Sequence, residues 1–316
     1  MLVLELFVQS NKLGVNMKKI FAIFVCMLTF VLGMYAQVEL KMVQIDTTPI
    51  SDVTKVNKIE MLSHEVTLNQ YETVMGDKPE DLSKGSFFTG MVGDELGSLI
   101  KKNKKKKNYF QETGVHDNHP VIGVTFYDAI YFCNKLSKLN GFTPVYSVDG
   151  KSDVESWGYT PHVGDFIKGK ISQDMKANGY RLPKGIEWLY AAKGNQELVY
   201  PGSDNIDEVA WYSKNTKRTT MEVDQKKPNA FGLYDMVGNV EEFIYAPKLD
   251  YNFAESNKTS KTPRDPLYTR TIGKSFKNMA NGCKELWYDR NIYSSRYFGS
   301  EQREDLGFRV VRSIVE

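Results

Sequence analysis

The sequence predicts an α+β fold in which a few short helices lie among many brief strands and long loops. Two segments in the middle of the chain carry the apolar spacing of short amphipathic helices. Strands and helices do not alternate in the way that parallel βαβ units require. With 316 residues, 41% of them hydrophobic and 25% charged, the composition is that of a soluble protein that buries a core.

Residues 1–36 are interpreted as an upstream extension followed by a signal peptide. Lysines follow Met17, and the apolar run 20–32 (IFAIFVCMLTFVL) has the length of a signal-peptide core and is short for a membrane span. Ala36 offers a small residue for cleavage, whereas Cys26 lies inside the apolar core, which disfavours a lipid anchor. We therefore expect an exported protein (periplasmic, cell-envelope or secreted) without a stable membrane span after cleavage; an uncleaved anchor is the alternative.

The charge balance excludes a global attraction to nucleic acid. The chain has 41 Lys and Arg against 39 Asp and Glu, a formal charge of +2. The lysine-rich run 101–107 (KKNKKKK) is typical of a solvated loop, and a local site for an anionic partner is the alternative. We expect no nucleic-acid partner.

Cysteine and histidine patterns indicate neither a disulfide framework nor a known zinc motif. If the signal segment is removed, Cys133 and Cys283 remain, and their wide separation predicts no particular pairing. Of the four histidines only His116 and His119 are close, in the loop-like HDNHP. They leave a zinc site open, although the ligand spacing of zinc motifs is missing.

The first ordered elements are a strand within 39–47 and a strand that passes into a short helix within 59–76. Thr67 is a suitable N-cap for that helix, and Gly76 is a suitable stop. We expect a single domain over residues 37–316.

The next ordered segment begins as a strand at 120–124 and continues as a helix. Thr125 with Asp128 forms a capping-box pattern, and Gly141 ends the helix. Cys133 lies on the apolar face of this helix and is interpreted as a packing residue.

Two long inserts, at about 77–118 and 142–178, interrupt the domain. After the second insert, Pro183 is expected to begin a helix that Gly194 ends. Its expected core-facing residues are Ile186, Leu189, Tyr190 and Ala192.

The segment 232–242 (GLYDMVGNVEE) gathers carboxylates around Gly238. Calcium prefers six to eight hard oxygen ligands, and a tight glycine turn lets carbonyl and carboxylate oxygens converge. Alternatively, Asp235 and Glu242 cap turns or pair with an arginine such as Arg309. Arg309 lies in an apolar, strand-like run and is interpreted as the buried partner of a carboxylate.

Six blocks of the chain resemble the formylglycine-generating enzyme, or sulfatase-modifying factor, family. The resemblance covers about residues 39–316 and implies an irregular, loop-rich variant of the C-type lectin fold. The blocks are HEVTLNQY (64–71), HPVIGVTFYDAIYFCNKLS (119–137), YRLPKGIEWLYAAKG (180–194), NAFGLYDMVGNVEEF (229–243), GKSF (273–276) and LGFRVVRS (306–313).

The resemblance implies one calcium ion at the glycine-containing block. Carried over residue by residue, the ligands are the side chains of Asp235 and Glu242 and the carbonyls of Gly238 and Val240. A second calcium ion is not expected, because 208–223 lacks a convincing acidic set.

The same resemblance places the family's two copper(I) cysteines just after the block that contains Ser275. These positions are Asn278 and Cys283, so one thiolate is missing. An asparagine amide is a hard, neutral oxygen ligand that does not replace a thiolate for copper(I). Copper and the standard formation of formylglycine are therefore not expected.

We predict a protein with a degenerate oxidase site that binds or assembles a protein or glycan of the cell envelope. A candidate recognition segment contains Trp287, Tyr288, Arg290, Tyr293, Arg296 and Tyr297. The alternative is an oxidase that acts on a protein cysteine through Cys283, beside Ser275, or through another metal. That enzyme needs Cys283 exposed at the base of a groove.

Overall fold

The computed structural model describes residues 38–55, 57–79, 113–163, 165–249, 265, 267–284 and 295–314, without the side chains of 248, 249 and 295–297. The residues from Leu40 on belong to one compact unit. The expected signal peptide, the lysine run 101–107 and the side chains of the candidate recognition segment lie outside this description. No helix among the described residues combines the length and the apolar character needed to cross a membrane.

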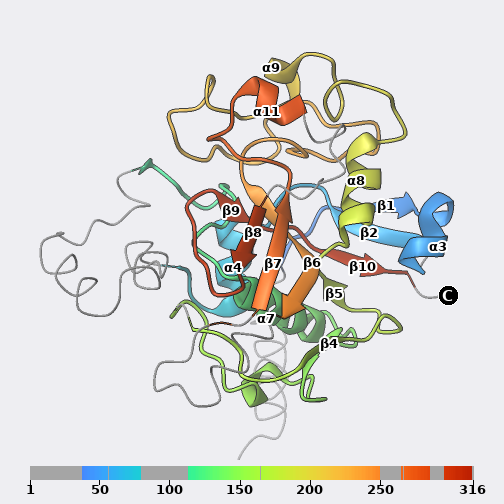
Figure 1. Cartoon of the computed structure of the whole chain (residues 1–316), viewed down its shortest axis with the longest axis vertical. Coiled ribbons are helices and arrows are strands. Elements are labelled where there is room, and N and C mark those ends of the chain that lie inside the picture. The colour runs from blue at the N-terminus through green and yellow to red at the C-terminus, as the bar shows by residue number, and fades with distance from the viewer. Residues whose placement is uncertain are drawn as a thin grey trace, which may run out of the picture. The chain divides into compact units, whose positions relative to one another are not determined.

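A four-stranded antiparallel sheet joins the two ends of the described chain (Figure 1). Its order is β1 (Met42–Asp46), β2 (Lys58–Leu62), β10 (Val311–Ser313) and β5 (Tyr180–Arg181). The strand expected within 39–47 is confirmed as β1. In the middle of the sheet the buried Met61 of β2 lies opposite Val311 of β10.

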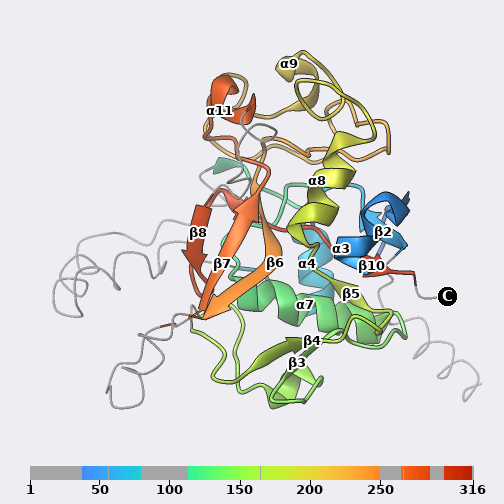
Figure 2. The ribbon, with the colours of Figure 1, turned by 45° about the vertical axis from the view of Figure 1, so that its right-hand side comes forward.

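A second four-stranded sheet carries the glycine-containing block at its start. Its order is β8 (Ser295–Phe298), β7 (Leu267–Ile272), β6 (Glu241–Leu249) and β9 (Leu306–Gly307). Figure 2 shows β6, β7 and β8 side by side. The β6–β9 pair is parallel and brings Glu241 opposite Leu306.

The insert at 142–178 contains the hairpin of β3 (Tyr146–Val148) and β4 (Ile171–Gln173). Five helices in the described part of the chain have five residues or fewer. They are η1 (Thr48–Ile50), α3 (Ser51–Thr54), η3 (Val154–Ser156), α9 (Ile206–Val209) and α11 (Ala280–Lys284).

Capping boxes begin the two helices α4 (Leu68–Met75) and α7 (Phe126–Leu139). The N-cap at Thr67 and the capping box at Thr125 are as predicted, whereas the full box at Thr67, completed by Gln70, was not predicted. In α7 the Oγ1 of Thr125 accepts from the backbone N of Asp128 at 2.9 Å, and the Asp128 carboxylate accepts from the backbone N of Thr125 at 2.8 Å. Gly76 ends α4 in the left-handed region, with φ of 87°. The cap of α7 is Asn140, one residue before the predicted Gly141.

The two helices pack through aromatic rings. Tyr71 of α4 stacks on Phe132 of α7 with 5.4 Å between ring centroids, and Phe308 meets both rings edge-on. Cys133 is fully buried on the same helix, which confirms that it is a packing residue. Neither Cys133 nor Cys283 forms a disulfide.

The segment 120–124 is not a strand, contrary to prediction. Only Pro120 makes an isolated bridge, to Thr67. The segment is instead held by single hydrogen bonds to two separate partners, Val121 N to Val66 O at 2.8 Å and Gly123 N to Arg303 O at 2.9 Å. Because these partners belong to different segments, no continuous ladder forms.

Helix α8 (Gly185–Lys193) begins two residues after the predicted Pro183 and buries a different face. Of the four residues expected to face the core, Ala192 is buried, Leu189 and Tyr190 are partly exposed but pack against the core, and Ile186 is partly exposed. The fully buried residues are Glu187, Trp188, Ala191 and Ala192. Polar partners rather than apolar spacing decide this face, because Glu187 pairs with the buried Arg181 at 2.7 Å and Trp188 donates to Glu242 at 2.8 Å.

We expect Thr125→Ala to lower the free energy of unfolding by about 1–2 kcal/mol, because the substitution removes the N-cap of α7. It also removes one of the two hydrogen-bond partners of the buried Tyr159 hydroxyl, which keeps its bond to Asp128. Urea unfolding measures the change. The control Thr73→Ala, in α4, removes a hydroxyl that contacts only its own helix and should change stability by less than about 0.5 kcal/mol. Equal effects of the two substitutions would contradict the capping role.

Candidate functional site

The segment 232–242 forms a tight turn against a neighbouring loop. Gly238 has φ of 85°, and a Cβ atom at this position would lie 2.2 Å from the carbonyl oxygen of Trp211. The adjacent Asn239 N donates to the same carbonyl at 2.8 Å. Glycine is therefore required here both by backbone conformation and by close approach.

Asn239 connects this turn to the loop 219–223. Its amide oxygen accepts from Met221 N at 3.0 Å, and its amide nitrogen donates to Met221 O at 3.2 Å. Asn239 is fully buried with φ of 54°. One polar side chain of GLYDMVGNVEE, that of Asn239, therefore pairs with the backbone of another loop.

Glu242 and Arg309 form a fully buried ion pair. The guanidinium binds both carboxylate oxygens at 2.7 Å, through Nε and Nη2. The indole Nε1 of Trp188 donates to the same carboxylate at 2.8 Å. Arg309 is thus confirmed as the buried partner of a carboxylate. Contact with both carboxylate oxygens suits the planar guanidinium of an arginine better than the ammonium of a lysine.

Two further carboxylates lie in this interior, those of Glu65 and Asp235. Among the described residues, neither oxygen of the Glu65 side chain has a hydrogen-bond partner, and Oδ1 of Asp235 has none either. Burial, with a contribution from the Asp235 carboxylate, raises the pKa of Glu65 well above its ordinary value. Burial also raises the pKa of Asp235 to about 6. When all are ionised, three carboxylates face the single guanidinium of Arg309.

The predicted calcium ligands fit these observations. Asp235 Oδ1 is a buried oxygen without a partner in the described part of the chain, and the excess of buried negative charge suits a divalent cation. Glu242 is already bound to Arg309, but its Oε1 accepts a hydrogen bond from Nη2 and retains a second lone pair. Gly238 and Val240 lie in the same turn, at the start of β6.

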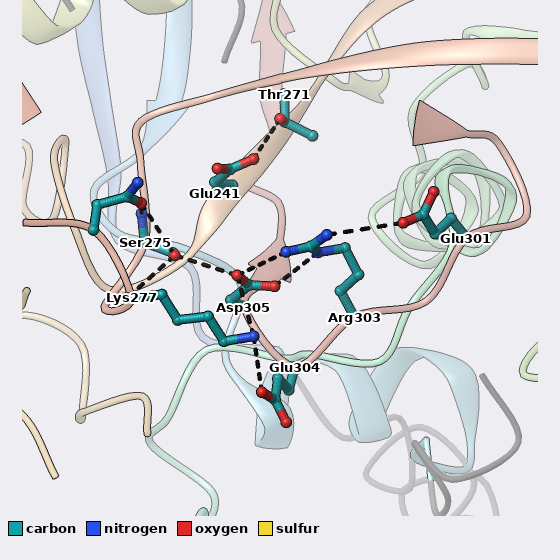
Figure 3. Close-up of polar contacts among 9 residues, drawn as sticks. Glu241, Thr271, Ser275, Lys277, Glu301, Arg303, Glu304 and Asp305 are labelled. Atoms are coloured by element: carbon teal, nitrogen blue, oxygen red, sulfur yellow. Dashed lines mark hydrogen bonds and ion pairs between the residues drawn. The ribbon is translucent and has the colours of Figure 1, made fainter. Parts of the chain in front are cut away.

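Ser275 belongs to a network of charged side chains near Glu241, the first residue of β6 (Figure 3). It follows β7, and its Oγ lies 3.4 Å from Oδ2 of Asp305. Arg303 binds both oxygens of Asp305, at 2.9 and 3.0 Å. Lys277 Nζ lies 2.8 Å from Glu304 and 3.4 Å from Asp305. We call these five residues the Ser275 network.

Two glutamates border the Ser275 network. Oε2 of Glu241 accepts from the Thr271 hydroxyl at 2.7 Å, and Glu301 lies 3.9 Å from Arg303 (Figure 3). Burial raises the pKa of both glutamates. Burial would also raise the pKa of Asp305, but hydrogen bonds and positive charge from Arg303 and Lys277 hold it below its ordinary value. Arg303 and Lys277 therefore favour the ionised form of the Asp305 carboxylate.

The side chains of Lys277, Glu304 and Arg303 reach the surface, with 41%, 40% and 33% of their side-chain area exposed. Asp305 and Ser275 lie beneath them, both buried. The network therefore presents both signs of charge to solvent on a base that internal hydrogen bonds hold in place.

The two predicted copper positions are near in sequence but differ in environment. Asn278 Oδ1 accepts from Ser275 N at 2.8 Å and closes the turn after the Gly-Lys-Ser block. Cys283 on α11 is fully buried in the hydrophobic core beside residues such as Trp188 and Tyr200. Burial raises the pKa of the Cys283 thiol to about 11, which disfavours the thiolate that binds metal or attacks a substrate.

The described residues around Ser275 can bind polar groups. The Ser275 hydroxyl has two possible acceptors, Asn278 Oδ1 at 3.3 Å and Asp305 Oδ2 at 3.4 Å. Sequence reasoning missed Arg303, Asp305 and Glu65. Arg303 and Asp305 lie just before LGFRVVRS, and Glu65 lies inside HEVTLNQY. Their positions within or beside the matched blocks could have marked them as candidate site residues.

Comparison with known proteins follows the same blocks. The sulfatase-modifying factor enzyme 1-like domain matches residues 29–314. Chaperone protein LppX of Paenibacillus barcinonensis is 34% identical over 202 residues, which cover 58% of this chain and 60% of that protein. The chain therefore spans less than two thirds of this curated relative.

Two solved structures share the fold. Treponema denticola variable protein 1 has 24% identity and a TM-score of 0.57, covering 89% of this chain and 98% of that one. The crystal structure of CarF has 21% identity and a TM-score of 0.57, covering 88% and 100%. Together with the small sheets and few helices, these matches confirm the loop-rich, C-type-lectin-like α+β fold.

We expect Gly238→Ala to destabilise the protein more than Gly232→Ala does. Both glycines have φ of 85°, but a Cβ at Gly232 meets nothing within 4 Å. Both substitutions should cost about 1 kcal/mol for the left-handed conformation, and Gly238→Ala a further 1–3 kcal/mol, roughly, for overpacking. Chemical denaturation measures the difference. Equal losses would show that the approach of Trp211 is unimportant.

We expect Arg309→Met to lower the free energy of unfolding by about 3–5 kcal/mol, because Glu242 is left buried and unpaired. The double variant Arg309→Met/Glu242→Gln should recover part of this loss, since it removes the charge and keeps an acceptor for Trp188. In the control Arg312→Met the half-buried pair with Glu60 is lost, and the cost should be about 1 kcal/mol or less. No recovery in the double variant would contradict this account.

Proposed function

This chain belongs to the sulfatase-modifying factor enzyme 1-like family, and we propose that it is a binding or assembly protein with a degenerate oxidase site. The observation that carries this proposal is the state of the two positions where the family resemblance puts copper ligands. Asn278 uses its side-chain oxygen to close the turn at Ser275, and Cys283 is a buried thiol in the core. Copper(I) chemistry through a thiolate pair is not supported by this arrangement.

The surface that we assign to binding is the exposed edge of the Ser275 network. Lys277, Arg303 and Glu304 together offer donors and acceptors that suit a polar, irregular chain segment. The surface rests on a buried side chain, because Arg303 donates two hydrogen bonds to Asp305. Such a surface favours a polypeptide ligand over an apolar small molecule.

The relative named chaperone protein LppX supports the choice of a polypeptide. The apolar run 20–32 supports export, so the proposed place of action is the periplasm, the cell envelope or the exterior. A glycan of the envelope is the second ligand class. The enzyme alternative, oxidation of a protein cysteine through Cys283, is disfavoured because that thiol is fully buried.

The proposal is tested by separating binding from oxidation. The probe is a fluorescent polypeptide that carboxymethylation keeps permanently unfolded, and we expect it to bind in a saturable manner. Lys277→Glu should weaken this binding by about tenfold, the ratio that corresponds to about 1.4 kcal/mol. Lys214→Glu places the same charge change on an exposed lysine of another loop and should leave binding unchanged. Absence of saturable binding would overturn the polypeptide assignment.

The enzyme alternative is tested with copper(I) titration of the reduced, calcium-loaded protein and an oxygen-dependent assay on a sulfatase-type cysteine peptide. We expect the protein and its Cys283→Ser variant to behave alike in both measurements. Tight one-to-one copper binding that disappears in the variant, with turnover of the peptide, would establish an oxidase and contradict the proposal.

We expect Cys283 in the native protein to react with iodoacetamide at pH 8 at least about a hundredfold more slowly than the unfolded chain does. With a pKa of about 11 against an ordinary value of 9.0, the thiolate fraction falls by about two orders of magnitude. Peptide-resolved mass spectrometry measures the rate for each cysteine separately. Rapid labelling of native Cys283 would show that the thiol is accessible and would favour the enzyme alternative.

We also propose that one calcium ion binds at Asp235, Gly238, Val240 and Glu242, the set that the family resemblance implies. The support is the Asp235 oxygen that lacks a partner among the described residues, in a region with excess negative charge. Bound there, calcium would supply charge compensation and hold the turn that precedes β6. This role is structural, since the four residues lie in the interior.

Calcium added to the EDTA-treated protein should raise its free energy of unfolding, by about 2.7 kcal/mol at a hundred times the dissociation constant. Asp235→Asn should abolish this calcium dependence, because it removes a charged ligand. Asp165→Asn changes an exposed carboxylate and should preserve it. If calcium has no effect on the unfolding of the unmodified protein, the calcium proposal is wrong.

A further inference from the structure

Two imidazoles and one carboxylate meet where the turn 116–119 lies beside the loop 219–223. His116, His119 and Glu222 each offer a ligand atom, and these atoms all lie within 4.8 Å of one another. Nε2 of His116 is 3.3 Å from Oε1 of Glu222. Two ligands of a tetrahedral zinc ion, each at about 2.0–2.1 Å from the metal, are separated by about 3.3 Å. This pair therefore already has the spacing of two zinc ligands.

Backbone hydrogen bonds hold the two loops in place. His119 N donates to His116 O at 2.8 Å, which closes a turn and brings both imidazoles to one side. Val223 N donates to Asn118 O at 3.0 Å and joins the Glu222 loop to that turn. Leu68 N donates to His119 O at 2.9 Å and ties the turn to the first turn of α4. The three side chains thus come from a preformed backbone.

A buried hydroxyl orients one of the imidazoles. Nδ1 of His119 lies 3.0 Å from Oγ1 of Thr220, and Thr220 is fully buried. When Nδ1 donates to this hydroxyl, Nε2 carries the lone pair that a metal requires. A hydrogen bond of this kind, from the nitrogen that does not bind the metal, is the usual support of a histidine ligand.

The exposure of the three residues suits an ion that enters from solvent. His119 is 6% exposed, whereas the side chains of His116 and Glu222 are 55% and 40% exposed. His119 forms the buried base of the cluster. The side chains of His116 and Glu222 lie at the surface, where they can contact an ion that arrives from solvent. Solvent remains available for a fourth ligand.

We propose that His116, His119 and Glu222 bind a zinc ion that joins the turn 116–119 to the loop 219–223. Two neutral imidazoles and one carboxylate form a ligand set typical of zinc, whereas calcium requires oxygen ligands and copper(I) favours thiolates. This cluster shares no residue with the proposed calcium ligands. It is the only group of this kind among the residues that the structure describes.

A surface histidine–carboxylate pair is the simpler interpretation, and the chain contains a suitable reference. Nε2 of His162 lies 3.1 Å from Oδ1 of Asp77, and within the described part of the chain no second histidine completes a three-ligand group there. If the His116–Glu222 contact were only such a pair, zinc would bind no better there than at His162. The comparison of the two sites therefore decides between the interpretations.

The test is isothermal titration of the full, untagged, EDTA-treated protein with zinc chloride, in the presence of excess calcium. We expect one ion per chain, with His116→Ala weakening binding by at least about a hundredfold and Glu222→Gln by at least about tenfold. His162→Gln should leave the affinity unchanged. Both cluster variants change exposed side chains, and circular dichroism verifies that they fold.

Cobalt(II) supplies a second measurement that reports geometry. The unmodified protein should develop the visible absorption of a four-coordinate nitrogen and oxygen site, zinc should displace it, and His116→Ala should lose it. Unchanged zinc affinity in both cluster variants, or equal loss in His162→Gln, would overturn the proposal. So would the absence of a one-to-one isotherm for the unmodified protein.

Discussion

The buried pair of Arg309 with Glu242 is the interaction on which the rest of this interior depends. The guanidinium joins the segment before β10 to the start of β6 and also contacts the carbonyl of Ser63 at 3.4 Å and that of Tyr234 at 3.1 Å. Three separated parts of the chain therefore meet at one side chain. A buried ion pair adds little net stability over an apolar replacement, but it makes any other arrangement of these segments leave a charge unpaired.

The turn at Gly238 follows from that constraint. Because Glu242 must reach Arg309, the preceding residues have to reverse direction against the carbonyl of Trp211, and only glycine leaves room for it. Asn239 then uses its amide to hold Met221, which brings the loop 219–223 to the base of the His116 turn. The turn at Gly238 thus holds the proposed calcium ligands and, through Asn239, the loop that carries Glu222 of the proposed zinc cluster.

The Ser275 network supports the proposed binding role better than the enzyme alternative. Asn278, which the family resemblance aligns with a copper ligand, closes its own turn with a hydrogen bond, and Cys283 lies in the hydrophobic core. Asp305 meanwhile organises Lys277 and Arg303 at the surface. Binding through exposed charges needs only this organisation, whereas oxidation needs an accessible thiolate, and the environment of Cys283 opposes one.

The sequence by itself determined the local features: the N-caps at Thr67 and Thr125, the packing role of Cys133, and the fold class through its matched blocks. The caps and the packing role depend on residues close together in the chain, and the fold class depends on motifs that are visible in the sequence. Only the tertiary structure decided that α8 buries Glu187 and Trp188, that 120–124 is not a strand, and that Glu222 joins His116 and His119. Each of these depends on partners outside the helix or segment itself, which helical or strand periodicity does not encode.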